Sequence, residues 1–265
     1  MKKLILFFFF LIVAPVCAAP VIDYNDGVYH IVLNGKEAAN KIDFVVADEL
    51  TTNYNVHKHS NSLLTVNTGF FDPKNGKTIS FINSKWGESA DPRFNESLIS
   101  NPVLNKNLEK ILNRSEFRVY ECGVSTVYDI VPHNEFVKEG CFLQMSAQGG
   151  PEIYPNLRLE EEFFIQKDSN GNIIRESCSV LHKTARTIIA LKGNDIHLFI
   201  ITNDNPMTLK EAAEYVKSFG VEKAMGFDGG SSTSFDYKNK IHVVSTQNDG
   251  NDTGRKLKSF MIYSK

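Results

Sequence analysis

Short apolar runs separated by polar turn residues dominate the pattern along this chain. The most apolar of these runs are rich in Val, Ile and Leu and cover residues 28–33, 42–47, 63–67, 187–191 and 196–202. Runs of this length, bounded by turn residues such as Asn34 and Gly35, are typical of β-strands. The last two runs are joined by the sequence Lys-Gly-Asn-Asp at 192–195, which predicts a β-hairpin.

The clearest helical pattern covers residues 208–219. Thr208 and Glu211 have the spacing of a capping box, in which each side chain bonds to the backbone of the other residue. Apolar residues at helical spacing share one face, at Leu209, Ala212, Ala213 and Val216. Gly220 then predicts the end of the helix, because glycine readily adopts the left-handed conformation found there. The apolar face must pack on a sheet, and residues 224–227 predict a short buried strand.

A second helix is predicted over residues 98–112, where apolar residues are spaced along a polar stretch. Pro102 requires this helix to start after Asn101, because proline is tolerated in the first turn of a helix but not in its interior. Predicted strands outnumber predicted helices along the chain. We therefore expect a single α+β domain with a mixed, mainly antiparallel sheet and a few packed helices.

The first 19 residues have the pattern of a signal peptide. Lys2 and Lys3 precede an apolar run over residues 4–13, and small residues favour cleavage after Ala18 or Ala19. The run is too short to span a bilayer, which takes roughly twenty residues, so we expect no transmembrane anchor. These features predict a periplasmic or secreted protein with a signal peptide (1–19), an N-terminal strand region (20–62) and a main domain (63–265).

The charge of the chain argues against nucleic acid as a partner. The formal net charge is −2, and basic residues form no block and do not alternate with aromatic residues. Proteins that bind nucleic acid neutralise phosphates with clustered Lys and Arg, a feature that this sequence lacks.

Cysteine usage fits an exported chain. One of the four cysteines leaves with the signal peptide, and the remaining three cannot all pair within one chain. We expect a disulfide between Cys122 and Cys141, because this pair closes the shorter loop, and a free Cys178. His57 and His59 have no nearby carboxylate or third histidine to complete a metal site, so we expect no metal and no other cofactor.

A turn rich in glycine and serine carries the strongest candidate chemistry. Residues 228–234 read Asp-Gly-Gly-Ser-Ser-Thr-Ser and directly follow the predicted strand at 224–227. Gly229 and Gly230 allow the backbone to approach a ligand closely and to present amides to an anion, and Asp228 adds a carboxylate. Asp-Gly-Gly is also common in plain tight turns, so this segment alone leaves both interpretations open.

Several segments, in a fixed order, resemble the phosphodiester glycosidase family. They are Asn67-Thr68-Gly69-Phe70-Phe71-Asp72, the Gly149-Gly150-Pro151 turn, Arg186 at the start of a strand, the run from Thr208 through 228–232, and Arg255 before a final apolar strand. The resemblance spans roughly residue 67 to the C-terminus. It implies a hydrolase that cuts a sugar from a phosphodiester. The chain departs from the family pattern at Thr68, where glycine is more usual, and over residues 85–113.

The resemblance also implies a role for each matched residue. A phosphate leaving group is already a stable anion, so one carboxylate can suffice, and Asp228 is expected to stabilise an oxocarbenium-like sugar. Arg186 is expected to bind the phosphate through its planar donors, and Asn67 to bond to the sugar or the phosphate. The residues expected to bind the substrate and its phosphate are Gly229, Gly230, Ser231, Ser232, Gly149, Gly150 and Arg255.

Other interpretations of these residues stay open at this point. Asn67 also suits a turn, and Arg186 also suits a structural salt bridge. A non-catalytic binding protein for phosphorylated glycans or cell-envelope polysaccharide would use the same turn at 228–234. In either case the expected partner is a phosphorylated glycan or sugar-phosphate diester.

Overall fold

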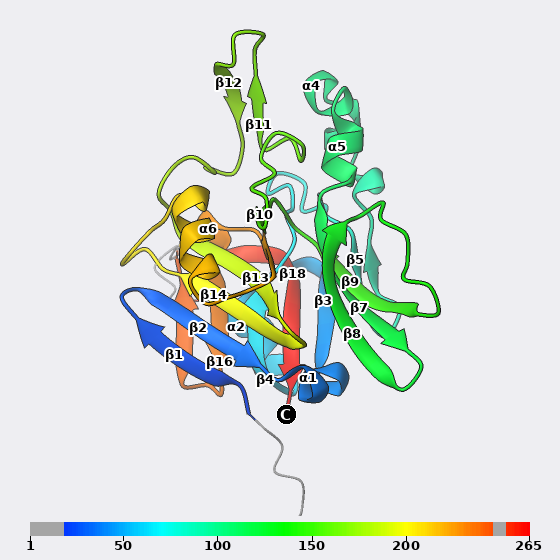
Figure 1. Cartoon of the computed structure of the whole chain (residues 1–265), viewed down its shortest axis with the longest axis vertical. Coiled ribbons are helices and arrows are strands. Elements are labelled where there is room, and N and C mark those ends of the chain that lie inside the picture. Colours follow the sequence, from blue (N-terminus) through cyan, green and yellow to red (C-terminus); the bar gives the residue numbers. More distant parts are fainter. Residues whose placement is uncertain (1–18, 246–252) are drawn as a thin grey trace, which may run out of the picture.

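Antiparallel sheets form the body of the protein (Figure 1). The structure, a computed structural model, describes residues 19–245 and 253–265, so residues 1–18 of the predicted signal peptide lie outside the described residues. Helices pack on the sheets, which confirms the predicted α+β class with mainly antiparallel strands. Within the described ranges, no helix is long and apolar enough to cross a membrane.

The largest sheet has six strands and contains the predicted hairpin. Its strands, in spatial order, are β1 (Val21–Asn25), β2 (Val28–Leu33), β14 (Asp195–Ile201), β13 (Arg186–Lys192), β15 (Lys223–Gly226) and β10 (Glu152–Tyr154). The hairpin is β13–β14, with Arg186 opposite Ile201. Because β2 pairs with β14, the N-terminal strands are hydrogen-bonded into a sheet of the main domain.

Two five-stranded sheets complete the body. One contains β17 (Ile241–Val244), β16 (Ser234–Tyr237), β4 (Ser62–Asn67), β18 (Lys256–Ser264) and β3 (Ile42–Thr52). The other contains β6 (Ser89–Ala90), β5 (Ile82–Asn83), β9 (Phe142–Gln148), β7 (Ser115–Cys122) and β8 (Ser125–Pro132). One apolar core joins all three sheets, and among its fully buried residues are Ile31, Leu198, Val66, Phe235, Phe117 and Met145. Burial of this apolar surface is the main force that holds the sheets together.

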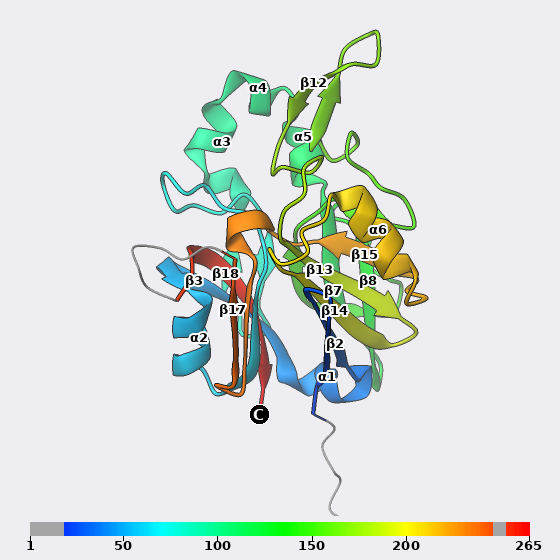
Figure 2. The same ribbon diagram turned by 90° about the vertical axis from the view of Figure 1, so that its left-hand side faces the viewer.

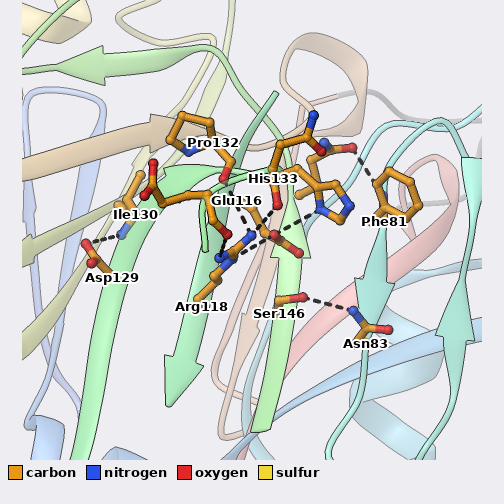
Figure 3. A network of polar contacts seen from close by, with 12 residues as sticks. Phe81, Asn83, Glu116, Arg118, Asp129, Ile130, Pro132, His133 and Ser146 are labelled. Carbon is orange, nitrogen blue, oxygen red and sulfur yellow. Dashed lines mark hydrogen bonds and ion pairs between the residues drawn. The ribbon is translucent and has the colours of Figure 1, made fainter. Parts of the chain in front are cut away.

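Two features fix the third sheet. Cys122, at the end of β7, forms a disulfide with Cys141, which confirms the predicted pairing and leaves Cys178 free. A polar network lies where β7 and β8 meet the following turn (Figure 3): Glu116 accepts from Arg118 Nε at 2.9 Å and pairs with His133 at 3.1 Å. Burial alone would raise the pKa of Glu116, but hydrogen bonds and charges from His133, Ser146 and Arg118 lower it below its ordinary value.

The longest helix, α6 (Leu209–Lys217), packs on the six-stranded sheet. Thr208 and Glu211 form the predicted capping box, with both reciprocal hydrogen bonds present. Gly220 follows with φ of +71°, as expected of the residue that ends a helix in the left-handed region. The buried side of α6 and the outer face of the sheet form one apolar cluster, which includes Leu209, Ala212, Val216, Ile188 and Phe199.

Two short helices arise from caps that the strand pattern conceals. Asn34 and Gly35, predicted as a turn between strands, instead begin α1 (Gly35–Lys41), where the Asn34 side chain accepts from the amide of Glu37. The prediction was wrong because Asn favours helix N-caps as strongly as turns. Thr52 caps α2 (Asn53–His59) in the same way by accepting from the amide of Asn55.

Two segments project from the body on the same side (Figures 1 and 2). One is the hairpin of β11 (Ile165–Lys167) and β12 (Ile173–Glu176). The other contains η1 (Pro92–Phe94) and three short helices, α3 (Glu96–Ser100), α4 (Pro102–Asn105) and α5 (Leu108–Leu112), in place of the one helix predicted over 98–112. Asn101 has an extended backbone and caps α4, with Pro102 in its first turn, so the chain restarts a helix there.

Candidate functional site

A cavity of about 360 Å³ lies beside the loop that follows β15. Both projecting segments contribute to its lining, through Arg175 of β12 and apolar side chains of α3, α4 and α5. Phe70 and Phe71, which follow β4, line it as well. The loop itself, with η2 (Gly230–Ser232), lies at the end of a buried strand, where a rigid sheet can hold functional groups in place.

Asp228 is, among the described residues, the one carboxylate that lines this cavity. Its side chain is only partly exposed. Burial raises the pKa of Asp228 to about 6, and a hydrogen bond from Ser232 and the positive charge of Arg255 offset part of that rise. The ionised carboxylate is therefore incompletely solvated, and a positive charge that enters the cavity would stabilise it.

Asn67 fixes the backbone of Asp228 and does not line the cavity. Its Nδ2 donates to the Asp228 carbonyl at 2.6 Å, and its Oδ1 accepts from the Thr187 hydroxyl at 2.8 Å and from the Ser234 amide at 3.1 Å. The side chain is buried, with 1% exposure. This end of β4 is thus tied to three segments that are distant in sequence, and the Asn67 amide determines where the Asp228 loop begins.

The glycine and serine residues of the turn lie at the cavity. Gly229, Gly230 and Ser231 line it, and Ser232 is buried just behind. Gly230 has φ of +59°, a conformation that favours glycine, and its amide donates to the Ala185 carbonyl at 2.8 Å. The turn therefore packs its backbone against the residue before β13 while it presents Ser231 to the cavity.

Arg255, the residue before β18, contacts this turn. Its terminal NH1 donates to the hydroxyls of Ser231 at 2.7 Å and Ser232 at 3.2 Å. The guanidinium also lies over the ring of Phe71, 5.1 Å from the ring centroid. Arg255 lines the cavity, so the final strand supplies it with a cation held in place by two hydroxyls and an aromatic face.

The structure places Arg186 behind the cavity wall. Its guanidinium donates to four backbone carbonyls, those of Met207 at 3.0 Å, Cys178 at 3.5 Å, and Ser179 and His182 at 2.7 Å each. Arg186 is 4% exposed, and burial lowers its pKa to about 10. In this arrangement Arg186 clamps the segment 178–182 through carbonyls, and the donors predicted to meet a phosphate are occupied.

Gly149 and Gly150 lie on the sheet side of the site, next to the strand β15. A Cβ on Gly149 would lie 2.3 Å from the carbonyl oxygen of Gly226, and one on Gly150 would lie 2.3 Å from a carboxylate oxygen of Glu162. Gly149 therefore allows close packing against the backbone of β15, and Gly150 leaves room for the Glu162 carboxylate. Neither lines the cavity of 360 Å³.

Two arginines that the sequence did not single out line the cavity. Arg114, 5% exposed, donates through Nε to the Glu162 carbonyl at 3.0 Å and lies over the ring of Phe164, 4.0 Å from its centroid. Its two terminal nitrogens make no hydrogen bond within the part of the chain that the structure describes. Burial lowers the pKa of Arg114. Arg175 bonds to the Phe163 carbonyl through NH1 and packs over the ring of Phe163.

Cys178 lines the same cavity as Asp228, Arg114 and Arg175. The thiol is exposed to the cavity, yet surrounding protein atoms raise its pKa to about 11. Asp228, Arg114 and Arg175 all act on it electrostatically. Three arginines and one carboxylate thus line a single cavity within the described residues, an arrangement that favours an anion. Arg114 directly follows the stretch that departs from the family pattern, residues 85–113, and no sequence signal marked it.

Comparisons with known proteins identify the family and the fold of the chain. The family model for phosphodiester glycosidases matches residues 60–263. The zebrafish N-acetylglucosamine-1-phosphodiester α-N-acetylglucosaminidase catalytic domain, auto-inhibited by its pro-peptide, has a similar structure with a TM-score of 0.65 and 13% identity, over 93% of this chain and 82% of that chain. A search of curated protein sequences gives no significant match.

Two further solved structures share the fold. A hypothetical protein from Synechocystis aligns with a TM-score of 0.55 and 11% identity, over 92% of this chain and 61% of that one. A protein of Burkholderia pseudomallei K96243 described as exported aligns with a TM-score of 0.57 and 11% identity, over 90% and 74% of the two chains. These likenesses show the fold, and the family model covers most of the sequence. The chain therefore belongs to the phosphodiester glycosidase family.

Proposed function

We propose that this chain is an exported hydrolase that cleaves a sugar from a sugar-1-phosphate diester. The observation that carries the proposal is the single cavity in which Asp228 lies with Arg114, Arg175 and Arg255. A phosphodiester is an anion that matches the arginines, and its sugar develops positive charge as the bond breaks, which matches the carboxylate. An ordinary glycoside has no charge at its scissile bond, so the arginines are the feature that favours a phosphodiester over it.

Each residue has a defined task in this proposal. Arg114 and Arg255 donate to the phosphate oxygens, because both guanidinium groups line the cavity and the terminal nitrogens of Arg114 have no partner among the described residues. The Asp228 carboxylate stabilises the oxocarbenium-like sugar. Asn67 and Arg186 act as positioning residues, since their bonds go to the backbone of the Asp228 loop and of residues 178–182.

The reaction balances without a cofactor. The bond between the anomeric carbon and the phosphate oxygen breaks, and its electron pair leaves with the phosphate monoester. Water then adds to the anomeric carbon and loses a proton to solvent, which gives the free sugar. Little protonation of the leaving group is required, because a phosphate monoester is already a stable anion.

Export is part of the same proposal. It is supported by the signal peptide pattern at the N-terminus, by the disulfide between Cys122 and Cys141, and by the structural likeness to a protein described as exported. Disulfides persist outside the reducing cytosol, which agrees with a periplasmic or secreted location.

Hydrolysis in water enriched in oxygen-18 tests the reaction and the bond that breaks. The mature protein is incubated with a panel of sugar-1-phosphate methyl diesters, and the products are analysed by mass spectrometry. We expect the label in the released sugar and none in methyl phosphate. Label in the phosphate would show cleavage at phosphorus and would contradict the role given to Asp228. Binding without any product would favour the alternative, a non-catalytic binding protein for phosphorylated glycans.

A further inference from the structure

One wall of the cavity is entirely apolar. Ile79, Leu98, Leu104 and Ile111 line it, and we refer to these four residues as the apolar wall. They belong to one hydrophobic cluster with Phe163, and three of them come from α3, α4 and α5. Leu98 and Ile111 are almost fully buried, whereas Ile79 and Leu104 keep part of their surface exposed. The projecting helices therefore present carbon surface to the cavity.

The apolar wall lies next to the arginines. Arg114 follows Ile111 by three residues, and its guanidinium lies over the rings of Phe164 and Phe70. A cation with unfilled donors and an apolar surface thus adjoin each other in one cavity. A ligand that complements both must carry a negative charge beside an apolar group.

Sugars fit this wall poorly. A sugar hydroxyl that loses water needs a hydrogen-bond partner, and four aliphatic side chains provide none. The polar groups that can meet sugar hydroxyls come from other segments of the lining, namely Ser177, Ser179 and Ser231. The wall is therefore suited to the part of the diester on the far side of the phosphate from the sugar.

We propose that the alcohol esterified to the phosphate is apolar, an alkyl, prenyl or aryl group, so that the substrate is an amphiphilic sugar phosphate. This inference rests on the proposed function for the identity of the sugar-phosphate bond. The pairing of anion and apolar chain, however, can be measured without any hydrolysis.

Binding of alkyl phosphates separates the two proposals. The affinities of the mature protein for methyl, butyl and octyl phosphate are measured by calorimetry, below the concentrations at which octyl phosphate forms micelles. We expect the dissociation constant to fall by up to about fourfold for each methylene that the wall buries, and to level off once the chain extends past it. Glycerol phosphate, a polar ester of similar size to the butyl ester, should bind no better than methyl phosphate.

A matched pair of variants tests the wall itself. Leu104→Asn places an amide on the wall and should flatten the dependence on chain length. Val103→Asn is the control, because Val103 is the neighbouring residue of α4, is 52% exposed and does not line the cavity, and it should preserve the dependence. Both side chains have access to solvent, so both variants should fold, which a melting curve checks.

Three results would overturn the inference. They are equal affinities for methyl and octyl phosphate, tight binding of glycerol phosphate, and an unchanged dependence on chain length in Leu104→Asn. If the dependence is present but no methyl diester is cleaved, the apolar wall stands as a binding surface and the proposed hydrolysis fails. If methyl diesters are cleaved but affinity does not depend on the length of the alkyl chain, the proposed hydrolysis stands and the inference about the apolar wall fails.

Discussion

The pH dependence of hydrolysis gives a direct test of the Asp228 carboxylate. Burial raises the pKa of Asp228 to about 6, and the proposed mechanism needs the ionised form. The value of kcat/KM should therefore rise with pH and reach a plateau above about 7. On the acid side it should fall to about a tenth of the plateau at pH 5 and about a hundredth at pH 4, because kcat/KM follows the ionised fraction of the free enzyme.

The position of this acid limb should respond to Arg255. The positive charge of Arg255 lowers the pKa of Asp228, so Arg255→Gln should move the limb to higher pH, whatever it does to the height of the plateau. Lys258→Gln removes the same charge three residues further along β18, where the ammonium instead donates to the Asp48 carbonyl. That variant should leave the limb in place.

The assay measures kcat/KM on a cleaved methyl diester at constant ionic strength, over a range in which the diester remains a monoanion. A separate check that each variant stays folded between about pH 4 and about pH 8 excludes acid unfolding as the cause of the limb. A flat profile would refute the carboxylate role. Activity that falls as the pH rises through about 6 would show instead that the protonated form of Asp228 is the active one.

Four further outcomes follow from the geometry. Asp228→Asn should raise the free energy of unfolding at pH 8. Because the folded-state pKa of Asp228 is raised, the parent protein loses stability as the pH rises from the unfolded value of 3.8 through about 6. The gain in the variant should be below about 3 kcal/mol, because the side chain keeps some contact with solvent, and an unchanged melting temperature would contradict it. Arg186→Lys should lower the free energy of unfolding, measured by denaturant titration, by about 2 to 3 kcal/mol, while the inhibition constant of inorganic phosphate stays the same. Weaker inhibition by phosphate in the variant would show that Arg186 binds the phosphate after all. Iodoacetamide should modify Cys178 slowly at pH 8, because the pKa of the Cys178 thiol is raised to about 11. Mass spectrometry should show that the Cys178 adduct accompanies loss of phosphate binding. If treated Cys178→Ser loses phosphate binding as well, the loss is due to modification at another residue. Replacing Cys122 and Cys141 by Ser should lower the free energy of unfolding by about 3 kcal/mol, as expected for a disulfide that closes a loop of this length. The value of kcat/KM should not change, since neither residue lines the cavity. A loss of turnover in the folded variant would show that the third sheet shapes the site.

The period of apolar residues was sufficient to locate the main strands and α6, because each buries one face of an element with a fixed repeat. Over residues 98–112 it was right about a helix that starts after Asn101, since α4 begins at Pro102. It missed the separate helix α3 before Asn101 and the break between α4 and α5. It also failed at Asn34, whose preference for turns and N-caps is equal. Where a short segment suits two local structures equally well, tertiary packing decides between them, and the sequence of the segment alone does not predict that packing.

The candidate site shows the same limit. The Asp228 loop was predictable because glycines and a carboxylate at a strand end form a local pattern. Arg114 was not, since nothing near it in sequence distinguishes a buried cation with unfilled donors from a surface arginine. Arg186 shows the converse, because its partners are backbone carbonyls from two other segments, and a carbonyl has no sequence signature.

The hydrogen bonds of Asn67 have a consequence for how the protein matures. They join residue 67 to Thr187, Asp228 and Ser234, over sequence separations of 120, 161 and 167 residues. Contacts of such range form only after long loops have closed, which is slow and comes with the completed fold. Before that moment the Asp228 carboxylate has no fixed position relative to Arg255, so the proposed active site does not exist in a partly folded chain. A chain kept unfolded for transport across a membrane would therefore be inert towards any substrate on the side where it is made, and its activity would begin only where it folds.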